Sequence, residues 1–105
     1  MPRKPDRPDA PHVIRWTFHA RPGRETEFEA AYGPEGPWVT LFRRAPGYLG
    51  TTLQRLPGRP GWYETVDVWG SAASYAAFRQ ASATEYEELD AACEALTLEE
   101  VPSQP

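Results

Sequence analysis

The sequence predicts a single α+β domain in which strands and helices follow the order β, α, β, β, α, β. Three observations indicate this class. Apolar side chains alternate with polar ones in the segments expected to be strands, and recur three and four positions apart in the segments between them. Pro-Gly and Gly-Pro pairs separate most of these segments. The length of 105 residues suits one ordinary domain.

Both ends of the chain are expected to lie outside the domain. Residues 1–11 carry Pro at positions 2, 5, 8 and 11, mostly between charged residues, which predicts a disordered arm because little can be buried there. Residues 102–105 are expected to form a flexible tail. The domain is therefore expected to span residues 12–101.

The first strand is expected over residues 12–19, where one face is apolar and carries Ile14, Trp16 and Phe18. Residues 24–32 are then expected to form a short amphipathic helix that a Gly-Pro pair ends. A second helix is expected to begin at Pro37, because proline suits the first turn of a helix, and to end before Pro46. The first helical segment therefore comes in two pieces.

Residues 48–56 and 62–69 are expected to form a hairpin, because the loop between them is rich in Pro and Gly. Apolar residues occupy both faces of the second of these strands, which predicts a sheet covered on both sides. Ser71 can cap a third helix, and a fourth is expected from Ser82 or Thr84. Residues 97–101 are expected to add a short last strand.

This order of elements is the split βαβ, ferredoxin-like arrangement with a four-stranded antiparallel sheet. Helices cover one face of such a sheet and leave the other face bare. A second copy of the chain is the simplest cover, and a short domain benefits from one, because it buries only about two thirds of its unfolded surface. We therefore expect a homodimer.

The composition disfavours several classes of protein. The net charge of −4 argues against a nucleic-acid binder, which needs clustered Lys and Arg. Neither an apolar run of about 20 residues nor a signal-peptide core is present, so we expect a cytoplasmic protein without membrane contact. Cys93 is the one cysteine and is expected to be a buried small residue. The two His show no ligand spacing, so no metal site is expected.

Three motifs, taken in their order and spacing, carry a resemblance to a known family. They are Arg21-Pro-Gly-Arg-Glu-Thr-Glu-Phe28, Arg44-Ala-Pro-Gly-Tyr-Leu-Gly50, and Val68-Trp-Gly-Ser71 followed by Tyr75 and Phe78. The chain between His12 and Val101 resembles the antibiotic biosynthesis monooxygenase domain. The resemblance implies a dimeric α/β barrel, in which the bare sheet faces of two chains pack together. It also implies oxidation of electron-rich aromatic molecules without metal or flavin.

In that family the pocket lies between the sheet and the helices of each subunit. The resemblance therefore gives five candidate ligand-binding residues: Trp16, Phe18, Phe42, Phe78 and Tyr86. Ordinary core packing is the alternative interpretation of each one. Oxygenation without a cofactor also needs a proton acceptor and polar donors that stabilise the resulting anion.

His19 and Asp67 are the candidate catalytic residues. His19 follows the polar alternation of the first strand, and could instead face the dimer interface or cap the strand end. Asp67 lies inside a strand, where pairing with Arg15 or Arg55 is the alternative to catalysis. Two further candidates for proton transfer are Glu64 and Tyr63, and Arg15 is able to hold an anion.

Some relatives degrade haem, using an Asn on the first strand and a His late in the second helical segment. The chain contains no Asn, and Trp16 and Glu88 stand at these two places, so haem degradation is disfavoured. Two hypotheses remain. The first is a cofactor-independent monooxygenase-like enzyme that acts on an aromatic or enolisable small molecule. The second is a non-catalytic dimeric barrel that binds a small ligand.

Overall fold

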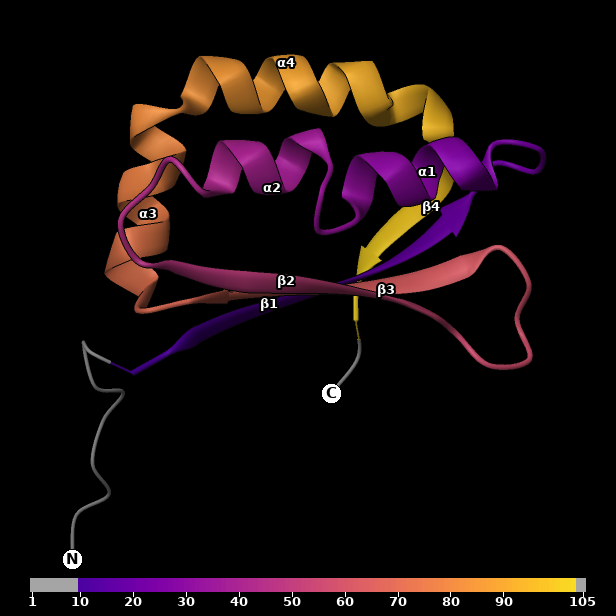
Figure 1. Ribbon diagram of the computed structural model, residues 1–105, viewed down its shortest axis with the longest axis horizontal. Coiled ribbons are helices and arrows are strands. Elements are labelled where there is room, and N and C mark those ends of the chain that lie inside the picture. Colours follow the sequence, from indigo (N-terminus) through magenta and orange to yellow (C-terminus); the bar gives the residue numbers. More distant parts are fainter. Residues whose placement is uncertain (1–9, 104–105) are drawn as a thin grey trace, which may run out of the picture.

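The computed structural model describes residues 10–103, in which all the helices lie on one side of a single antiparallel sheet (Figure 1). The elements follow one another as β1 (His12–Ala20), α1 (Glu25–Tyr32), α2 (Pro37–Phe42), β2 (Tyr48–Arg55), β3 (Trp62–Trp69), α3 (Ala72–Ala81), α4 (Ala83–Cys93), a 3-10 turn η1 (Glu94–Leu96) and β4 (Thr97–Pro102). The sheet order is β2-β3-β1-β4. The predicted ferredoxin-like α+β class is thereby confirmed.

The ends of the ordered chain differ slightly from the predicted boundaries. Most of the arm expected over residues 1–11 lies outside the described residues, as do residues 104–105. At the other end β4 includes Pro102, and the Ser103 N–H donates to the carbonyl oxygen of Arg15 at 3.1 Å. The Ser103 and Thr17 hydroxyls also hydrogen-bond at 2.8 Å. Pro102 and Ser103 thus belong to the folded domain and not to a flexible tail.

Aromatic side chains dominate the core between the sheet and the helices. Phe28 on α1 is fully buried, with its ring 5.3 Å from Phe18 and 4.7 Å from Tyr63 between centroids. Trp69, at the end of β3, is equally buried and lies 5.0 Å from Phe78. Such ring pairs contribute about 0.5–1.5 kcal/mol each beyond area burial. Two aromatic clusters therefore fix the helical layer onto the sheet.

The break between α1 and α2 follows from a close backbone approach. A Cβ at Gly36 would collide with the carbonyl oxygens of Ala30 and Ala31 in the last turn of α1. Pro37 then starts α2, where its missing N–H has no helical partner to lose. The Gly36-Pro37 pair, at which the sequence predicts a new helix, therefore allows α2 to begin in close contact with the end of α1.

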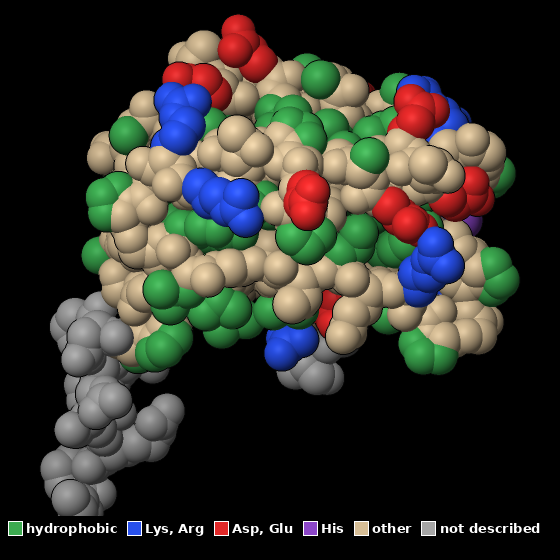
Figure 2. Space-filling model, in the orientation of Figure 1, with side chains coloured by type: hydrophobic (Ala, Val, Ile, Leu, Met, Phe, Trp, Pro, Cys, Tyr) green, Lys and Arg blue, Asp and Glu red, His purple; other side chains and the backbone are tan. Residues whose placement is uncertain are grey.

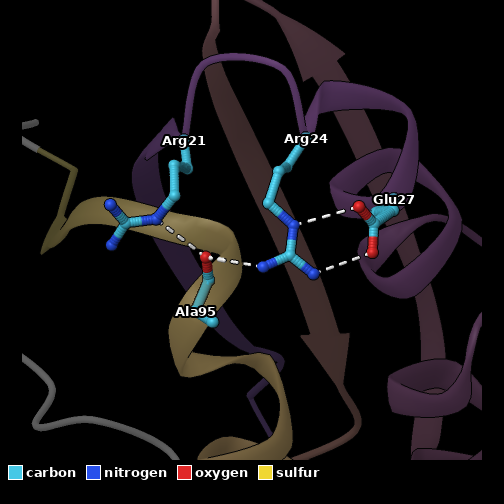
Figure 3. Close-up of polar contacts among 4 residues, drawn as sticks. All are labelled: Arg21, Arg24, Glu27 and Ala95. Carbon is cyan, nitrogen blue, oxygen red and sulfur yellow. Dashed lines mark hydrogen bonds and ion pairs between the residues drawn. The ribbon is translucent and has the colours of Figure 1, made fainter.

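The β1–α1 turn is attached by two arginines to η1, the 3-10 turn that follows α4, as Figure 3 shows. Arg21 Nε donates to the carbonyl oxygen of Ala95 at 2.9 Å, and the Arg24 guanidinium reaches the same oxygen at 3.5 Å. Arg24 also forms a two-pronged contact with Glu27 at 2.9–3.0 Å. Cationic donors suit the free carbonyls at a helix end, so this motif has a structural role.

The sheet face that points away from the helices is bare in the single chain (Figure 1). It carries apolar side chains that include Val13, which is 46% exposed, and Val101, which is 42% exposed. Arg15 and Glu64 form an ion pair of 3.6 Å on the same face. The expected arrangement, with helices on one side only, is therefore confirmed, while the partner that would cover this face remains a prediction.

The face of the molecule shown in Figure 2 has interspersed acidic and basic side chains, and hydrophobic side chains show along the line between helices and sheet. Interspersed charges of both signs produce no strong one-sign field over this face. Within residues 10–103, none of the helices has the length and hydrophobicity that crossing a bilayer requires.

Candidate functional site

A cavity of about 80 Å³ opens between the sheet and the helical layer. Side chains from all four strands and all four helices form its wall, so it occupies the centre of the fold. The residues that line it are Ile14, Trp16, Phe18, Tyr32, Trp38, Phe42, Thr51, Thr65, Asp67, Tyr75, Tyr86, Asp90 and Glu100. Pockets that enclose drug-sized ligands usually hold roughly 300–1,000 Å³. A multi-ring molecule therefore requires side chains to move aside.

The cavity brings together most of the residues predicted from the sequence. Four of the five candidate wall residues line it: Trp16, Phe18, Phe42 and Tyr86. Phe78, the fifth, does not, because it lies behind Phe42 at 5.4 Å between ring centroids and packs on Trp69. Its predicted place in the wall is corrected to the buried core.

The two candidate catalytic residues lie on opposite faces of the sheet. Asp67 lines the cavity, whereas His19 is on the bare face, with its imidazole stacked 4.5 Å from the Trp62 ring. Side chains alternate along a strand, and Phe18, which precedes His19, points into the core. One pocket of one chain therefore contains Asp67 without His19.

Asp67 is a partly buried carboxylate held by neutral hydroxyls. Thr51, its cross-strand partner on β2, donates a hydrogen bond to Oδ1 at 2.7 Å. Because that bond uses the only Thr51 hydroxyl proton, the Tyr48 hydroxyl, 2.6 Å from Thr51 Oγ1, must be the donor there. Burial raises the pKa of Asp67, and the bond from Thr51 offsets part of that rise. The carboxylate is therefore a stronger base than an ordinary Asp.

The alternative explanation of Asp67, an ion pair with an arginine, is wrong. Arg15 pairs with Glu64 at 3.6 Å on the bare face, and Arg55 pairs with Glu29 at 2.8 Å. None of the ion pairs between described residues includes Asp67. A buried carboxylate without a cationic partner is costly to the fold, which favours a functional reason for its place.

The other candidates for proton transfer are occupied elsewhere. The Tyr63 hydroxyl donates to Glu29 at 2.6 Å on the outer side of α1, and burial, followed by this bond, raises its pKa to about 12. Glu64 is engaged with Arg15 on the bare face. Neither residue lines the cavity, whereas Asp67 does.

Two tyrosines of the wall are held by one arginine on α3. Arg79 Nη1 donates to the Tyr75 hydroxyl oxygen at 3.0 Å, and its guanidinium carbon lies 3.8 Å from the centre of the Tyr86 ring. Since the Tyr75 oxygen accepts this bond, its own proton stays available for an acceptor in the cavity. Burial raises the pKa of Tyr86 to about 12, so that hydroxyl is neutral at pH 7.

Another part of the wall collects acidic and aromatic side chains. Asp90 on α4 and Glu100 on β4 both line the cavity, with Tyr32 and Trp38. Burial raises the pKa of Glu100, and the negative charge of Asp90 adds to the rise. Trp38 is 7% exposed, and its Nε1 is buried with no hydrogen-bond partner among the described residues. This region therefore combines unpaired carboxylates with an unused donor.

Cys93 lies behind this acidic region and is 4% exposed, as expected for a buried small residue. Burial raises the pKa of its thiol. A protonated, enclosed thiol is a poor nucleophile. Within residues 10–103, His, Cys, Asp and Glu side chains form no group of three or more that could hold a metal ion.

Sequence reasoning missed seven polar or aromatic residues of the wall: Tyr32, Trp38, Thr51, Thr65, Tyr75, Asp90 and Glu100. A signal for Thr51 did exist, because pairing the predicted strand ends 56 and 62 across the loop puts it opposite Asp67. Asp90 is one helical turn after Tyr86 and so shares its side of α4. No comparable signal marked Glu100, because a bulge interrupts the register of β4.

Comparison with known proteins establishes the fold. No family model matches the sequence, and no curated protein matches it significantly. Among solved structures, a mutant of SnoaB, a cofactor-independent oxygenase from Streptomyces nogalater, has a TM-score of 0.70 at 23% identity, over 92% of this chain and 93% of that chain.

Two proteins named as candidate antibiotic biosynthesis monooxygenases are also similar. The one from Chloroflexus aurantiacus has a TM-score of 0.64 at 20% identity, over 91% of this chain and 93% of that chain. The one from Bordetella bronchiseptica has a TM-score of 0.61 at 24% identity, over 89% of this chain and 96% of that chain. The resemblance inferred from the sequence is therefore confirmed at the level of fold.

Proposed function

We propose that this chain is a cofactor-independent monooxygenase-like enzyme that acts on an aromatic or enolisable small molecule. The observation that carries the proposal is Asp67, a partly buried carboxylate with a raised pKa and no cationic partner among residues 10–103, which lines a cavity with aromatic walls. A carboxylate in that setting is costly to the fold and suited to general-base catalysis. The fold, shared with a named cofactor-independent oxygenase, supports the same reaction class.

The proposed reaction begins with proton transfer to Asp67. The ionised carboxylate takes a proton from an activated CH₂ group of the substrate, and the electron pair of that C–H bond moves into an enolate. The enolate reduces O₂, and one oxygen atom bonds to the same carbon. Loss of the second hydrogen and cleavage of the O–O bond then give a carbonyl and one water. Overall, CH₂ and O₂ become C=O and H₂O, which balances atoms and electrons.

Tyr75 is the donor placed to stabilise the enolate oxygen. Its hydroxyl oxygen accepts a bond from Arg79, so the hydroxyl proton is free, and the neighbouring cation strengthens it as a donor. A donor aimed at the developing negative charge in a site with little water typically contributes a factor of 10²–10³ to kcat. Asp67 and Tyr75 together provide the base and the donor that the reaction requires.

The homodimer belongs to the same proposal. The bare sheet face carries half-exposed apolar side chains and an ion pair of Arg15 with Glu64. A second copy placed on this face would bury those side chains and form a dimeric α/β barrel. The cavity lies on the other side of the sheet, so each subunit would keep its own site.

The test is oxygen uptake with a panel of small anthrones and quinols, for the wild type and for Asp67→Asn. The wild type should consume oxygen, and Asp67→Asn should lower kcat by about 10²-fold or more, because the amide cannot accept the proton. Glu64→Gln, a carboxylate change on the other face of β3, should keep wild-type activity. Equal rates for Asp67→Asn and wild type would contradict the proposal, as would no turnover across the panel.

The alternative is a non-catalytic dimeric barrel that binds a small ligand. The observation that favours it is the small cavity of about 80 Å³, which leaves little room for a multi-ring substrate together with O₂. In that case small aromatic molecules should bind, as seen by quenching of Trp16 and Trp38 fluorescence, while oxygen consumption stays at the background rate. The two functions therefore give different results in the same pair of assays.

A further inference from the structure

We propose that the cavity recognises an aromatic molecule that carries a positive charge, such as a protonated arylalkylamine, in preference to an aromatic acid. The inference extends the proposed function, because it names a substrate class for the same site. Only the statement that the ligand is turned over rests on that function; the binding preference does not. It depends on the charges of the cavity wall, the faces of its aromatic rings and the lack of counter-ions.

The ionisable groups of the wall are carboxylic acids and tyrosine hydroxyls. Asp67, Asp90 and Glu100 line the cavity, and the lining residues include no Lys, Arg or His. Asp67 is partly buried, while Asp90 and Glu100 are exposed where the cavity opens. A cleft bounded by charges of one sign attracts ligands of the opposite sign. Bringing a ligand carboxylate into this cavity would add a like charge to a site with no cation in its wall.

Asp90 and Glu100 form the acidic end of this wall. Asp90 comes from α4 and Glu100 from β4. Burial raises the pKa of Glu100 and the negative charge of Asp90 raises it further, so the two carboxyl groups interact electrostatically. Neither takes part in any of the ion pairs formed between described residues. An ammonium group between them would relieve their repulsion and supply a counter-ion for Glu100.

Aromatic rings beside the two carboxylates provide a second source of recognition. Trp16, Trp38, Tyr32 and Tyr86 line the same cavity, and the Trp38 ring lies 5.0 Å from the Tyr86 ring, edge to face. The faces of such rings attract organic cations, most strongly where water is excluded. The Tyr86 ring already accepts the Arg79 guanidinium, at 3.8 Å from its centre, which shows that this wall tolerates a cation.

Arg79 neutralises the wall only in part, because it interacts with the charge of Asp90, whereas Glu100 is influenced by negative neighbours alone. Arg79 is not among the lining residues, and its guanidinium is engaged with the Tyr75 hydroxyl and the Tyr86 ring. The acidic end is equally unsuited to a metal ion, because three side chains able to ligate one do not come together within residues 10–103. An organic cation, which needs two carboxylates and a ring face but no defined coordination geometry, fits the arrangement better.

The test compares three probes of equal size: 2-phenylethylamine, 2-phenylethanol and phenylacetate. Their binding to the full-length protein at pH 7 is measured by tryptophan fluorescence and by titration calorimetry. The amine should bind roughly tenfold or more tightly than the alcohol, and the acid should bind most weakly. The preference for the amine should shrink as NaCl is raised to about 0.5 M, because salt screens the attraction.

Charge-neutral variants locate the effect. Asp90→Asn and Glu100→Gln should each reduce the preference for the amine over the alcohol, and the double variant should bring the two affinities within about twofold of each other. The matched control is Glu88→Gln, which changes an exposed carboxylate of the same helix that does not line the cavity. This control should leave the preference unchanged.

The inference is overturned if the three wild-type affinities are equal, if the acid binds best, or if the amine does not bind at about 10 mM. It is also overturned if the double variant keeps the full preference. Oxygen uptake is a separate readout. Selective binding of the amine without turnover of any amine-bearing substrate would contradict the proposed enzyme and leave the recognition of cations intact.

Discussion

Asp67 joins two features that a purely structural carboxylate avoids, namely burial and the lack of a cationic partner among the residues described. Thr51 and Tyr48 hold it through a chain of hydroxyls, which fixes its orientation without removing its affinity for a proton. A carboxylate ready to take up a proton serves acid–base chemistry and weakens the fold. Replacing the Asp67 side chain should therefore change the stability of the protein as well as its activity.

Asp67→Asn should raise the melting temperature at pH 7. Because burial raises the folded-state pKa of Asp67, folding is favoured while the group is protonated, below its unfolded pKa of about 3.9. That contribution is lost as the pH rises through the higher folded-state value. The gain from Asn should therefore be greatest near pH 7 and fade towards pH 3, as calorimetry from pH 3 to 7 can measure. An equal or lower melting temperature at pH 7 would count against this account.

Tyr75 and Arg79 should act as one unit. Tyr75→Phe removes the donor, and Arg79→Met removes the cation that strengthens it, so each should lower kcat for oxygen uptake by about 10²- to 10³-fold with a smaller change in KM. The double variant should be little worse than either single one. Arg79→Lys should recover part of the rate. A purely additive double variant, or an unchanged pH–rate profile in Arg79→Met, would point to a structural role instead.

At the scale of the helices, the backbone at Gly36 lies in close contact with the end of α1. Gly36→Ala should destabilise the protein by about 1–3 kcal/mol, because its Cβ meets two carbonyl oxygens at the end of α1 and not a flexible side chain. Urea unfolding measures the effect. The neighbouring change Glu35→Ala, at an exposed position, should stay within about 0.5 kcal/mol of the wild type. Similar stabilities for the two variants would show that α2 can shift at little cost.

The elements themselves could be predicted from the sequence, because their signals are local. Alternation marked β1 and β3, and the Pro and Gly pairs marked the ends of α1, α2 and the β2–β3 hairpin. Ser71 caps α3 as expected, with Ser74 N–H donating to its hydroxyl at 3.0 Å. Each of these features depends on a few neighbouring residues, and a single chain displays them directly.

The site was predicted only in part, because its geometry joins distant segments. Asp67 was proposed from its place inside a strand, and Trp16 from the family resemblance together with its place on the apolar face of the first strand; both line the cavity. Phe78 was misplaced, because helix periodicity gives the buried side of α3 but not whether a ring meets a cavity or another ring. His19 follows Phe18 on β1, and neighbouring side chains of a strand point to opposite faces. Phe18 therefore faces the pocket, whereas His19 faces the bare side of the sheet.

At the scale of the whole molecule, the bare face of the sheet predicts a dimer. Measuring the oligomeric state tests that prediction directly. Val68→Asp puts a charge beside Val13 on that face, and it should turn a sedimenting dimer into a monomer at micromolar concentration. Gln80→Asp, an equally charged change on the exposed side of α3, should leave the dimer intact. A wild type that sediments as a monomer would refute the dimeric barrel.

Because Cys93 is the protein's single cysteine and is enclosed in the core, it can serve as a built-in reporter of opening. A thiol reagent should modify the native protein only when α4 lifts away from Tyr32 and Trp38, so the labelling rate measures how often the molecule exposes its interior. A molecule bound in the cavity contacts the same two rings and should slow the labelling. Rapid modification of the native state, unaffected by urea, would show that this region is already open.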